Sequence, residues 1–404
     1  MAERLWAPVD AGALVLFRFV LGVLLAVEAY RQWANGWIAS SFVEPSFHFS
    51  FDGFAWVKPL PLPWMTAFFA GLGVLGVLLA FGVARRVMAF LSLLGWAYVF
   101  LIDLALYLNH LYLVLLLLAV MTVVPLRRNV QTVPAWALGL LRFQLAVPYL
   151  FGGIAKLNGD WLRGEPMRRW LESTAFDAEW QAMLASYGGL LLDLFVVPAL
   201  LWRRTRWFAL AVAMAFHLTN AWLFQIGIFP WLMIFGTLMF LPAKTFALFS
   251  GSGELRGPEV PKRPRLVMGL LAAWAVFHVA VPLRHWVYPG DVAWTEEGQL
   301  FAWRMKLTQK DNQTAFLVIF KSDGKHWEVP LEQFLTRRQE DKMAGDPAMI
   351  RKFARHLRAT LGDVEVYAST RTALNEHPAA PLVDPRVDLA ADPLPDGWIL
   401  PRQN

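Results

Sequence analysis

Long apolar runs recur along the first 289 residues of this chain, and they constrain its fold more than any other feature. Most of them approach the roughly 20 residues that a helix needs to cross a bilayer. Charged residues make up only 17% of the chain, against about 25% in soluble domains. The sequence therefore predicts a multi-pass α-helical membrane protein with about nine spans. The expected spans are 11–32, 64–83, 87–106, 110–126, 135–156, 188–202, 206–224, 229–248 and 266–287, of which the shortest, 188–202, is expected to be tilted or re-entrant.

The distribution of arginine predicts how these spans are oriented. Arginine pairs at 85–86, 127–128 and 203–204 fall in alternate loops, which the positive-inside rule assigns to the cytoplasm. The N-terminus is therefore expected in the cytoplasm and the C-terminal segment on the opposite side. The net charge of +6 follows from this topology and does not indicate nucleic-acid binding. The chain has no cysteine, which excludes disulfides and thiolate metal sites.

The composition changes near Tyr288, which predicts a transmembrane domain over 1–289 and an extracytoplasmic α+β domain over 290–404. In the second domain, strands are expected at 300–307, 314–320, 326–329 and 364–369. Asp346 and Pro347 are typical of a helix start, and Gly362 of its end. In the first domain, the aromatic and proline-rich segment 35–63 is expected to lie in the membrane interface as a lid over a lipid-accessible pocket.

Several polar side chains stand at span ends or inside spans, on the half expected to be external: Asn109, His110, Lys156, His217 and Asn220. His217 and Asn220 are three residues apart and so share one helix face. Gly152 and Gly153, just before Lys156, allow another backbone or a ligand to come close. Because ionisable groups inside a membrane pair or line cavities, these residues together predict a functional site.

Each of these residues also has a purely structural interpretation. Lys156 is either a base held neutral by low dielectric or an anchor that extends its ammonium to water. His110 can cap a turn, and His217 can be a hydrogen-bonded core histidine. Other charged residues in the spans are expected to form structural pairs that hold the bundle together: Arg18, Glu28, Asp103, Arg142 and Asp193. No metal site is expected, since His110 and His217 lack the spacing of paired ligands.

Taken in order, several strings of the chain resemble the vitamin K-dependent γ-glutamyl carboxylase family, including its bacterial relatives. The resemblance extends over almost the whole length. The strings are Leu16-Phe-Arg-Phe-Val-Leu-Gly, Pro59-Leu-Pro-Leu-Pro-Trp-Met, Asn109-His-Leu-Tyr-Leu, Gly152-Gly-Ile-Ala-Lys-Leu-Asn-Gly-Asp-Trp-Leu-Arg-Gly, Gly188-Gly-Leu-Leu-Leu-Asp-Leu, Phe216-His, Leu223-Phe-Gln-Ile-Gly-Ile-Phe and Asp384-Pro-Arg-Val-Asp.

The resemblance implies a reaction and roles for these residues. The family's catalytic lysine falls on Lys156, within the pattern Lys-Leu-x-x-Asp-Trp-x-x-Gly, and deprotonates vitamin K hydroquinone. Oxygen then adds to give a strong base, which removes a γ-proton from a glutamate of a peptide or protein substrate. The resulting carbanion captures CO2, and vitamin K leaves as its epoxide. The Asn-His pair of the family falls on Asn109 and His110, and its later histidine on His217. We assign Lys156 and His110 to catalysis. Cofactor binding is assigned to Asn109, His217, Asn220, Tyr149 and Trp161.

The resemblance further implies contact with membrane lipid, through which the hydroquinone enters, and a bacterial inner membrane as location. The sequence also departs from the animal enzymes. It lacks the cysteine pair that joins their two domains, it has Ala155 where they have a second lysine, and it matches only partly around Phe301-Ala-Trp-Arg-Met. Three alternatives stay open: a hydroquinone epoxidase without glutamyl carboxylation, a quinone- or lipid-binding scaffold, and a proton-coupled transporter.

Overall fold

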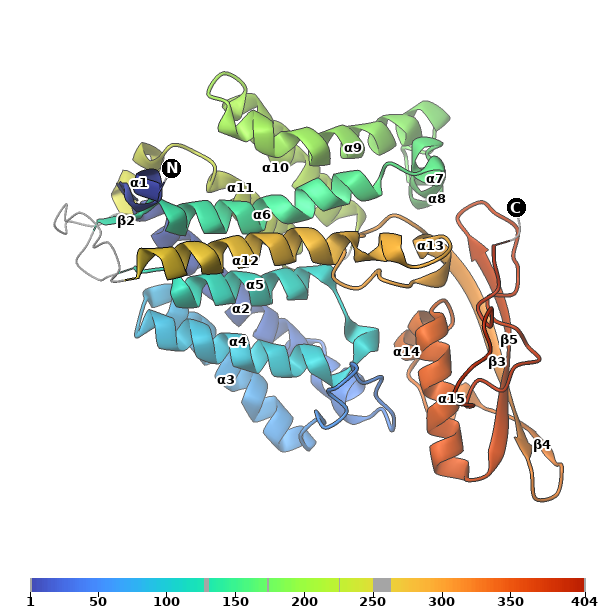
Figure 1. Ribbon diagram of the computed structural model, residues 1–404. Coiled ribbons are helices and arrows are strands. Elements are labelled where there is room, and N and C mark those ends of the chain that lie inside the picture. The colour runs from blue at the N-terminus through green and yellow to red at the C-terminus, as the bar shows by residue number, and fades with distance from the viewer. Residues whose placement is uncertain (1, 127–130, 173, 225, 250–262, 403–404) are drawn as a thin grey trace.

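The computed structural model describes residues 2–126, 131–172, 174–224, 226–249 and 263–402. It is a helical bundle with a sheet-containing domain at one end (Figure 1). Among the described residues, six helices are long and apolar enough to cross a membrane. They are α2 (Gly12–Ala34), α3 (Leu62–Phe81), α4 (Arg85–Ile102), α6 (Ala135–Ala155), α9 (Glu179–Leu201) and α12 (Pro264–Leu283). The expected multi-pass helical fold is therefore confirmed.

The expected number of nine spans is not confirmed. Two of the nine correspond to short apolar helices, α5 (Asn109–Val123) and α11 (Phe229–Leu238), of which α11 has only ten residues. A third corresponds to α10 (Arg206–Leu223), whose polar residues reduce its hydropathy. The expected short span 188–202 is part of α9, which has 23 residues and begins at Glu179. Arg127 and Arg128, used above for orientation, lie outside the described residues.

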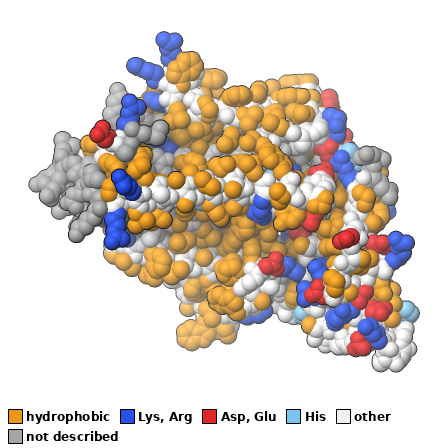
Figure 2. All heavy atoms as spheres, viewed as in Figure 1, with side chains coloured by type: hydrophobic (Ala, Val, Ile, Leu, Met, Phe, Trp, Pro, Cys, Tyr) orange, Lys and Arg blue, Asp and Glu red, His pale blue; other side chains and the backbone are white. Residues whose placement is uncertain are grey.

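The surface of the bundle suits a hydrocarbon solvent. Figure 2 shows hydrophobic side chains covering this face of the bundle, while charged side chains gather over the C-terminal domain. Inside the bundle, α2 and α3 approach closely at Gly22 and Gly76. A Cβ on Gly76 would lie 2.7 Å from the carbonyl oxygen of Gly22, so only glycine fits at this contact.

Among the charged residues expected to hold the bundle together, the two arginines bind backbone carbonyl oxygens and Glu28 forms an ion pair within its own helix. The guanidinium of Arg142 donates to the carbonyl oxygens of Met239 and Leu241, at 2.7 and 3.0 Å. Arg18 donates to the carbonyl oxygen of Ala80, and Glu28 pairs with Arg31 one turn along α2. These contacts bind charged groups inside the bundle, although Nε of Arg18 is buried without a hydrogen-bond partner among the described residues.

The C-terminal domain contains a three-stranded antiparallel sheet in the order β4–β3–β5, with α15 (Pro347–Leu361) packed on it. The strands are β3 (Lys310–Phe320), β4 (His326–Glu328) and β5 (Val364–Leu374). The carboxylate of Asp346 caps α15 by accepting from the backbone of Ala348 and Met349, and Gly362 ends it with a φ of 90°. The helix start and stop expected from the sequence are thus present. A second helix, α14 (Arg337–Met343), was not expected.

The segment 300–307, expected as a strand, is irregular. Phe301, Trp303 and Lys306 have φ angles of 63°, 59° and 48°, which a strand cannot contain. Side chains with a Cβ are costly in this region of φ, so contacts around the segment must hold it in place. Its turns direct Met305 and Lys306 toward the membrane domain, where both line cavities described below.

The expected lid, 35–63, is instead part of the contact between the two domains. Phe47 lies 5.8 Å from Phe353 of α15 and stacks on His356 at 4.2 Å between ring centroids. Nearby, the buried carboxylate of Asp103 accepts from Gln339 of α14 at 2.7 Å. Neither cavity described below is lined by this segment. Phe47 therefore joins the two domains, and the segment covers neither cavity.

Candidate functional site

A cavity with about 670 Å³ of empty space lies between α6, α9, α10 and α11. Its walls are mainly aromatic and aliphatic, with a few polar groups, which is typical of small-molecule sites. Five of the seven site residues expected from the sequence line it: Tyr149, Lys156, Trp161, His217 and Asn220. The structure therefore brings together, from three helical segments, residues that are up to 71 positions apart (149 to 220).

Glycines on α6 allow α9 to come close enough to form this cavity. A Cβ on Gly153 would lie 2.7 Å from the side chain of Leu194 and 3.0 Å from its backbone nitrogen. A Cβ on Gly152 would lie 3.2 Å from the carboxylate of Asp193. Larger residues at these positions would push α9 away from the end of α6. The close approach expected for the two glycines is thus present.

Lys156, at the end of α6, forms an ion pair with Asp193 of α9. Both side chains are nearly buried, with 9% and 10% of their surfaces exposed. The ammonium also lies over the ring of Trp161, 5.1 Å from its centroid. Asp193 was expected to be a structural partner within the bundle, and its partner is the expected catalytic lysine. The lysine is therefore not an anchor that extends into water.

Tyr149 connects two other helices to this cavity. Its hydroxyl lies 2.5 Å from Nε2 of His217 on α10 and 3.1 Å from the hydroxyl of Thr237 on α11. Thr237 donates its own proton to the carbonyl oxygen of Met233, at 2.7 Å. Because Thr237 uses its proton in that bond, the hydroxyl of Tyr149 donates to Thr237 and accepts from Nε2–H of His217. Nδ1 of His217 is then a bare acceptor, and it is buried without a hydrogen-bond partner among the described residues.

The other two expected residues, Asn109 and His110, line a second cavity of about 1660 Å³. This cavity lies between the bundle and the C-terminal domain. Asn109 accepts a hydrogen bond from the hydroxyl of Tyr107 at 2.9 Å, and the ring of His110 lies 5.8 Å from that of Phe229. The expectation that all these polar groups converge in one site is therefore only partly met, because they occupy two neighbouring cavities.

The two cavities have a common wall. Four residues line both: Ile226, Phe229, Met305 and Lys306. The ammonium of Lys306 lies 4.8 Å from the centroid of the Phe224 ring. Burial lowers the pKa of Lys306, and the nearby ammonium of Lys342 lowers it further. Its side chain is nevertheless accessible, because it faces the open space of the cavities.

Basic side chains outnumber acidic ones among the described residues that line the second cavity: Arg304, Lys306, Lys310 and Lys342 against Glu296, Asp341 and Asp346. Nε of Arg304 is buried without a hydrogen-bond partner among the described residues. Two of the cavity's carboxylates are already engaged, Glu296 by Lys310 at 2.6 Å and Asp346 as the cap of α15. Burial and the nearby Glu296 raise the pKa of Asp346 to about 6, which reduces its negative charge at neutral pH. Such a cavity favours an anionic ligand.

Sequence reasoning missed several residues of the site. Asp193 carried a signal, a carboxylate within an apolar run, but its pairing with Lys156 depends on how α6 and α9 pack. Thr237 is one of several threonines in apolar helices, and no spacing marks it. Arg304 and Lys306 stood in a segment expected to be a strand, which gives no reason for their side chains to face the membrane domain.

The arrangement supports proton transfer beside an apolar ligand. Lys156 and Asp193 can exchange a proton with each other, and Tyr149, His217 and Thr237 form a chain of exchangeable hydrogen bonds. The rest of the cavity wall is mainly apolar, so these polar groups can orient an aromatic ligand with hydroxyl groups.

Two family models match the chain. The model described as HTTM domain matches residues 6–244, and the one described as vitamin K-dependent gamma-carboxylase, lumenal domain, matches residues 263–404. Together they define a membrane protein of the carboxylase class, an HTTM bundle followed by a lumenal domain. The chain belongs to the vitamin K-dependent γ-glutamyl carboxylase family. No solved structure matches it.

The ion pair makes a prediction about stability. Lys156→Met leaves the carboxylate of Asp193 buried and unpaired, which costs about 3–5 kcal/mol. Asp193→Leu in turn leaves the ammonium of Lys156 buried and unpaired, at a similar cost. The double variant Lys156→Met/Asp193→Leu removes both charges and should regain most of the lost stability. Thermal unfolding of the four proteins in detergent measures this. Additive losses in the double variant would show that the two charges do not depend on each other.

Proposed function

We propose that this protein is a vitamin K hydroquinone-dependent carboxylase that couples epoxidation of the quinone to carboxylation of glutamyl residues. Membership of the family supports the class of reaction. The observation that carries the proposal is the pair of cavities with a common wall. The first is apolar and contains an ion-paired lysine, and the second carries unpaired cations.

The first cavity fits a hydroquinone. Its apolar walls would suit the ring and an isoprenoid chain, which would enter from the lipid around the bundle. The bare nitrogen of His217 and the side chain of Asn220 would hold the hydroxyl groups. When bound, vitamin K hydroquinone would supply, with O2, the strong base that removes the γ-proton before CO2 is added.

Lys156 would act as the initial base through Asp193. An ammonium cannot accept a proton, so the lysine must first lose one. Transfer from the ammonium to the carboxylate gives a neutral amine and a neutral acid, and low dielectric favours that neutral pair. The amine then takes the proton of a hydroquinone hydroxyl and becomes an ammonium again. Asp193 thus holds the first proton while Lys156 accepts the second, and the carboxyl releases its proton before the next turnover.

The second cavity would hold the acidic substrate. Lys306 and Arg304 would bind carboxylates of a glutamate-containing peptide or protein, as unpaired cations do in a partly desolvated site. Lys306 lines both cavities, so a glutamate bound there would stand next to the hydroquinone. Asn109 and His110 would face the same substrate and donate to developing negative charge.

The remaining alternatives differ in which cavity they use. An epoxidase without carboxylation needs only the first cavity, and a quinone-binding scaffold needs no proton transfer. The second cavity, with its cations beside the first, favours carboxylation over both. The ion-paired lysine favours an enzyme over a scaffold, because a buried charge pair is not needed to bind an apolar ligand.

We further propose a bacterial inner membrane as the location, with the N-terminus in the cytoplasm and an extracytoplasmic domain over 290–404. The N-terminus lies at the end of the bundle away from the sheet, and the C-terminus lies beside the sheet (Figure 1). A reporter that is active only outside the cytoplasm should work when fused to the C-terminus. Activity of a strictly cytoplasmic reporter at that position would overturn the orientation.

A substitution of Lys156 tests whether its amine acts as a base. Lys156→Arg keeps a positive charge beside Asp193, but a guanidinium with a pKa above about 12 cannot become a base. The variant should insert in the membrane and lose hydroquinone-dependent epoxide formation by at least about 100-fold, the usual scale for a positioned base. Epoxide is measured on purified protein by chromatography. Near-normal epoxide formation by Lys156→Arg would remove the lysine from proton transfer.

Substitution of Lys306 tests the substrate site. Lys306→Met should raise KM for a glutamate peptide about tenfold or more, the scale of one charge-assisted hydrogen bond, and leave epoxide formation largely intact. The wild-type KM should rise as pH increases through the lowered pKa of Lys306, because only the ammonium binds a carboxylate. In Lys306→Arg that rise should disappear.

The matched control for Lys306 is Lys325→Met, in the exposed hairpin between β3 and β4, because Lys325 lines neither cavity. It should leave KM unchanged. An equal effect of the two methionine substitutions would mean that general charge, rather than the position of Lys306, attracts the peptide.

A further inference from the structure

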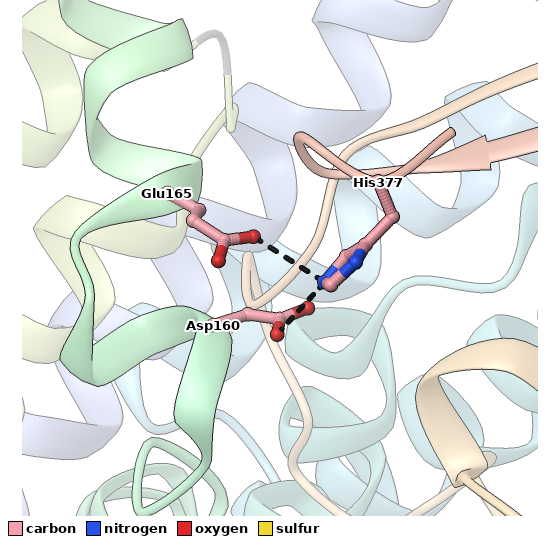
Figure 3. Close-up of side chains that lie close together, drawn as sticks. All are labelled: Asp160, Glu165 and His377. Atoms are coloured by element: carbon pink, nitrogen blue, oxygen red, sulfur yellow. Dashed lines mark hydrogen bonds and ion pairs between the residues drawn. The ribbon is translucent and has the colours of Figure 1, made fainter. Parts of the chain in front are cut away.

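A second cluster of charged side chains joins the two domains outside both cavities. Asp160 lies in α7 (Gly159–Leu162) and Glu165 begins α8 (Glu165–Leu171), both in the loop between α6 and α9. His377 belongs to the turn that follows β5 in the C-terminal domain. Figure 3 shows the two carboxylates and the imidazole pointing toward one another. None of the three was expected to be functional from the sequence.

The separations between the three side chains match one face of a metal coordination shell. Nε2 of His377 lies 3.2 Å from Oδ1 of Asp160 and 3.6 Å from Oε2 of Glu165. All three donor atoms lie within 4.8 Å of one another. Ligands about 2.0–2.2 Å from a tetrahedral metal ion stand roughly 3.3–3.5 Å apart, so little movement is needed to bind one.

One donor of the cluster is buried and unused. The side chain of Glu165 is only 6% exposed, and its Oε2 makes no hydrogen bond with any described residue. Its other oxygen accepts from Nε of Arg163 at 2.6 Å, which turns Oε2 toward His377. A buried carboxylate oxygen without a donor is costly, and a bound cation removes that cost.

The surroundings resemble the outer shell of a metal site, in which the ligating carboxylates are themselves hydrogen-bonded. Asn375 donates to Oδ2 of Asp160 at 2.8 Å, and Arg163 donates to Oδ1 at 2.8 Å. Asp160 is thus oriented by neighbours that are not among the three proposed ligands.

Two arginines compete with a cation here. Arg163 touches both carboxylates, and Nη1 of Arg402 lies 3.6 Å from Asp160. The side chain of Arg163 is 57% exposed, so it can withdraw into water when an ion enters. Within the described part of the chain, neither arginine donates a hydrogen bond to Oε2 of Glu165 or contacts the imidazole of His377. The ion therefore meets two donors that no arginine occupies.

We propose that Asp160, Glu165 and His377 bind one divalent transition-metal ion, which clamps the C-terminal domain to the membrane domain. One imidazole and two carboxylates form a donor set for such ions. Asp160 is adjacent to Trp161, whose ring covers Lys156, so the clamp also fixes one wall of the first cavity. This site is separate from the proposed reaction, and its test does not depend on catalysis.

The test is metal binding by the full-length protein in detergent, purified without a histidine tag and stripped with a chelator. Co2+ is the probe, followed by visible absorption and by bound metal after equilibrium dialysis. Wild-type protein should bind about one Co2+ per chain and unfold at a higher temperature with it. His377→Ala should weaken binding by at least about 100-fold, the upper range for loss of even an outer-shell partner.

Two further variants make the result decisive. Glu165→Gln keeps the size of the side chain and should also lose the ion. This variant tests the proposal even if His377→Ala does not fold. Glu376→Gln is the matched control, because it breaks the adjacent interdomain pair with Arg168 and leaves all three donors in place. It should bind Co2+ like the wild type. Equal binding by wild type, His377→Ala and Glu165→Gln would mean an adventitious ion only and would overturn the proposal.

Discussion

The ion pair between Lys156 and Asp193 is the interaction on which the site depends. It joins the end of α6 to the middle of α9 inside the bundle, and it can form only because Gly152 and Gly153 let α9 approach. A single buried charge would be strongly unfavourable in this environment, so each residue requires the other. The same pair places the lysine under Trp161 and opens the apolar cavity beside His217 and Asn220.

The site also depends on the contact between the C-terminal domain and the bundle, because Met305 and Lys306 complete the common wall of the two cavities. The chain has no cysteine to fix this contact covalently. Polar contacts do it instead. Arg168 of α8 binds Glu376 through two hydrogen bonds, at 2.8 and 3.0 Å, and Gln339 binds the buried Asp103. The proposed metal clamp would act beside the first of these.

Much of this architecture follows from local sequence patterns. Apolar runs of about 20 residues mark α2, α3, α6 and α12, since a bilayer imposes that length. His217 and Asn220 line the same cavity because residues three apart share a helix face. Asp346 and Gly362 mark the start and end of α15, because helix caps act on backbone groups only a few residues away in the sequence.

What the sequence did not reveal depends on packing between distant segments. Hydropathy does not mark where a helix ends, so the short α5 and α11 were taken for full spans. The turns at Phe301 and Trp303 contain no glycine, and surrounding contacts rather than local preference hold their positive φ. The pairing of Asp193 with Lys156 and the meeting of His377 with Asp160 join residues 37 and 217 positions apart. No local pattern carries that information.

The central claim is that one protein couples the two cavities. The most direct measurement incubates purified protein with vitamin K hydroquinone, O2, labelled bicarbonate and a glutamate peptide, and reads epoxide and peptide-bound label in the same reaction. The account predicts that both products form and that neither forms without hydroquinone. Epoxide without any fixed label would contradict the coupling and leave an epoxidase, and the absence of both products would contradict the proposed enzyme altogether.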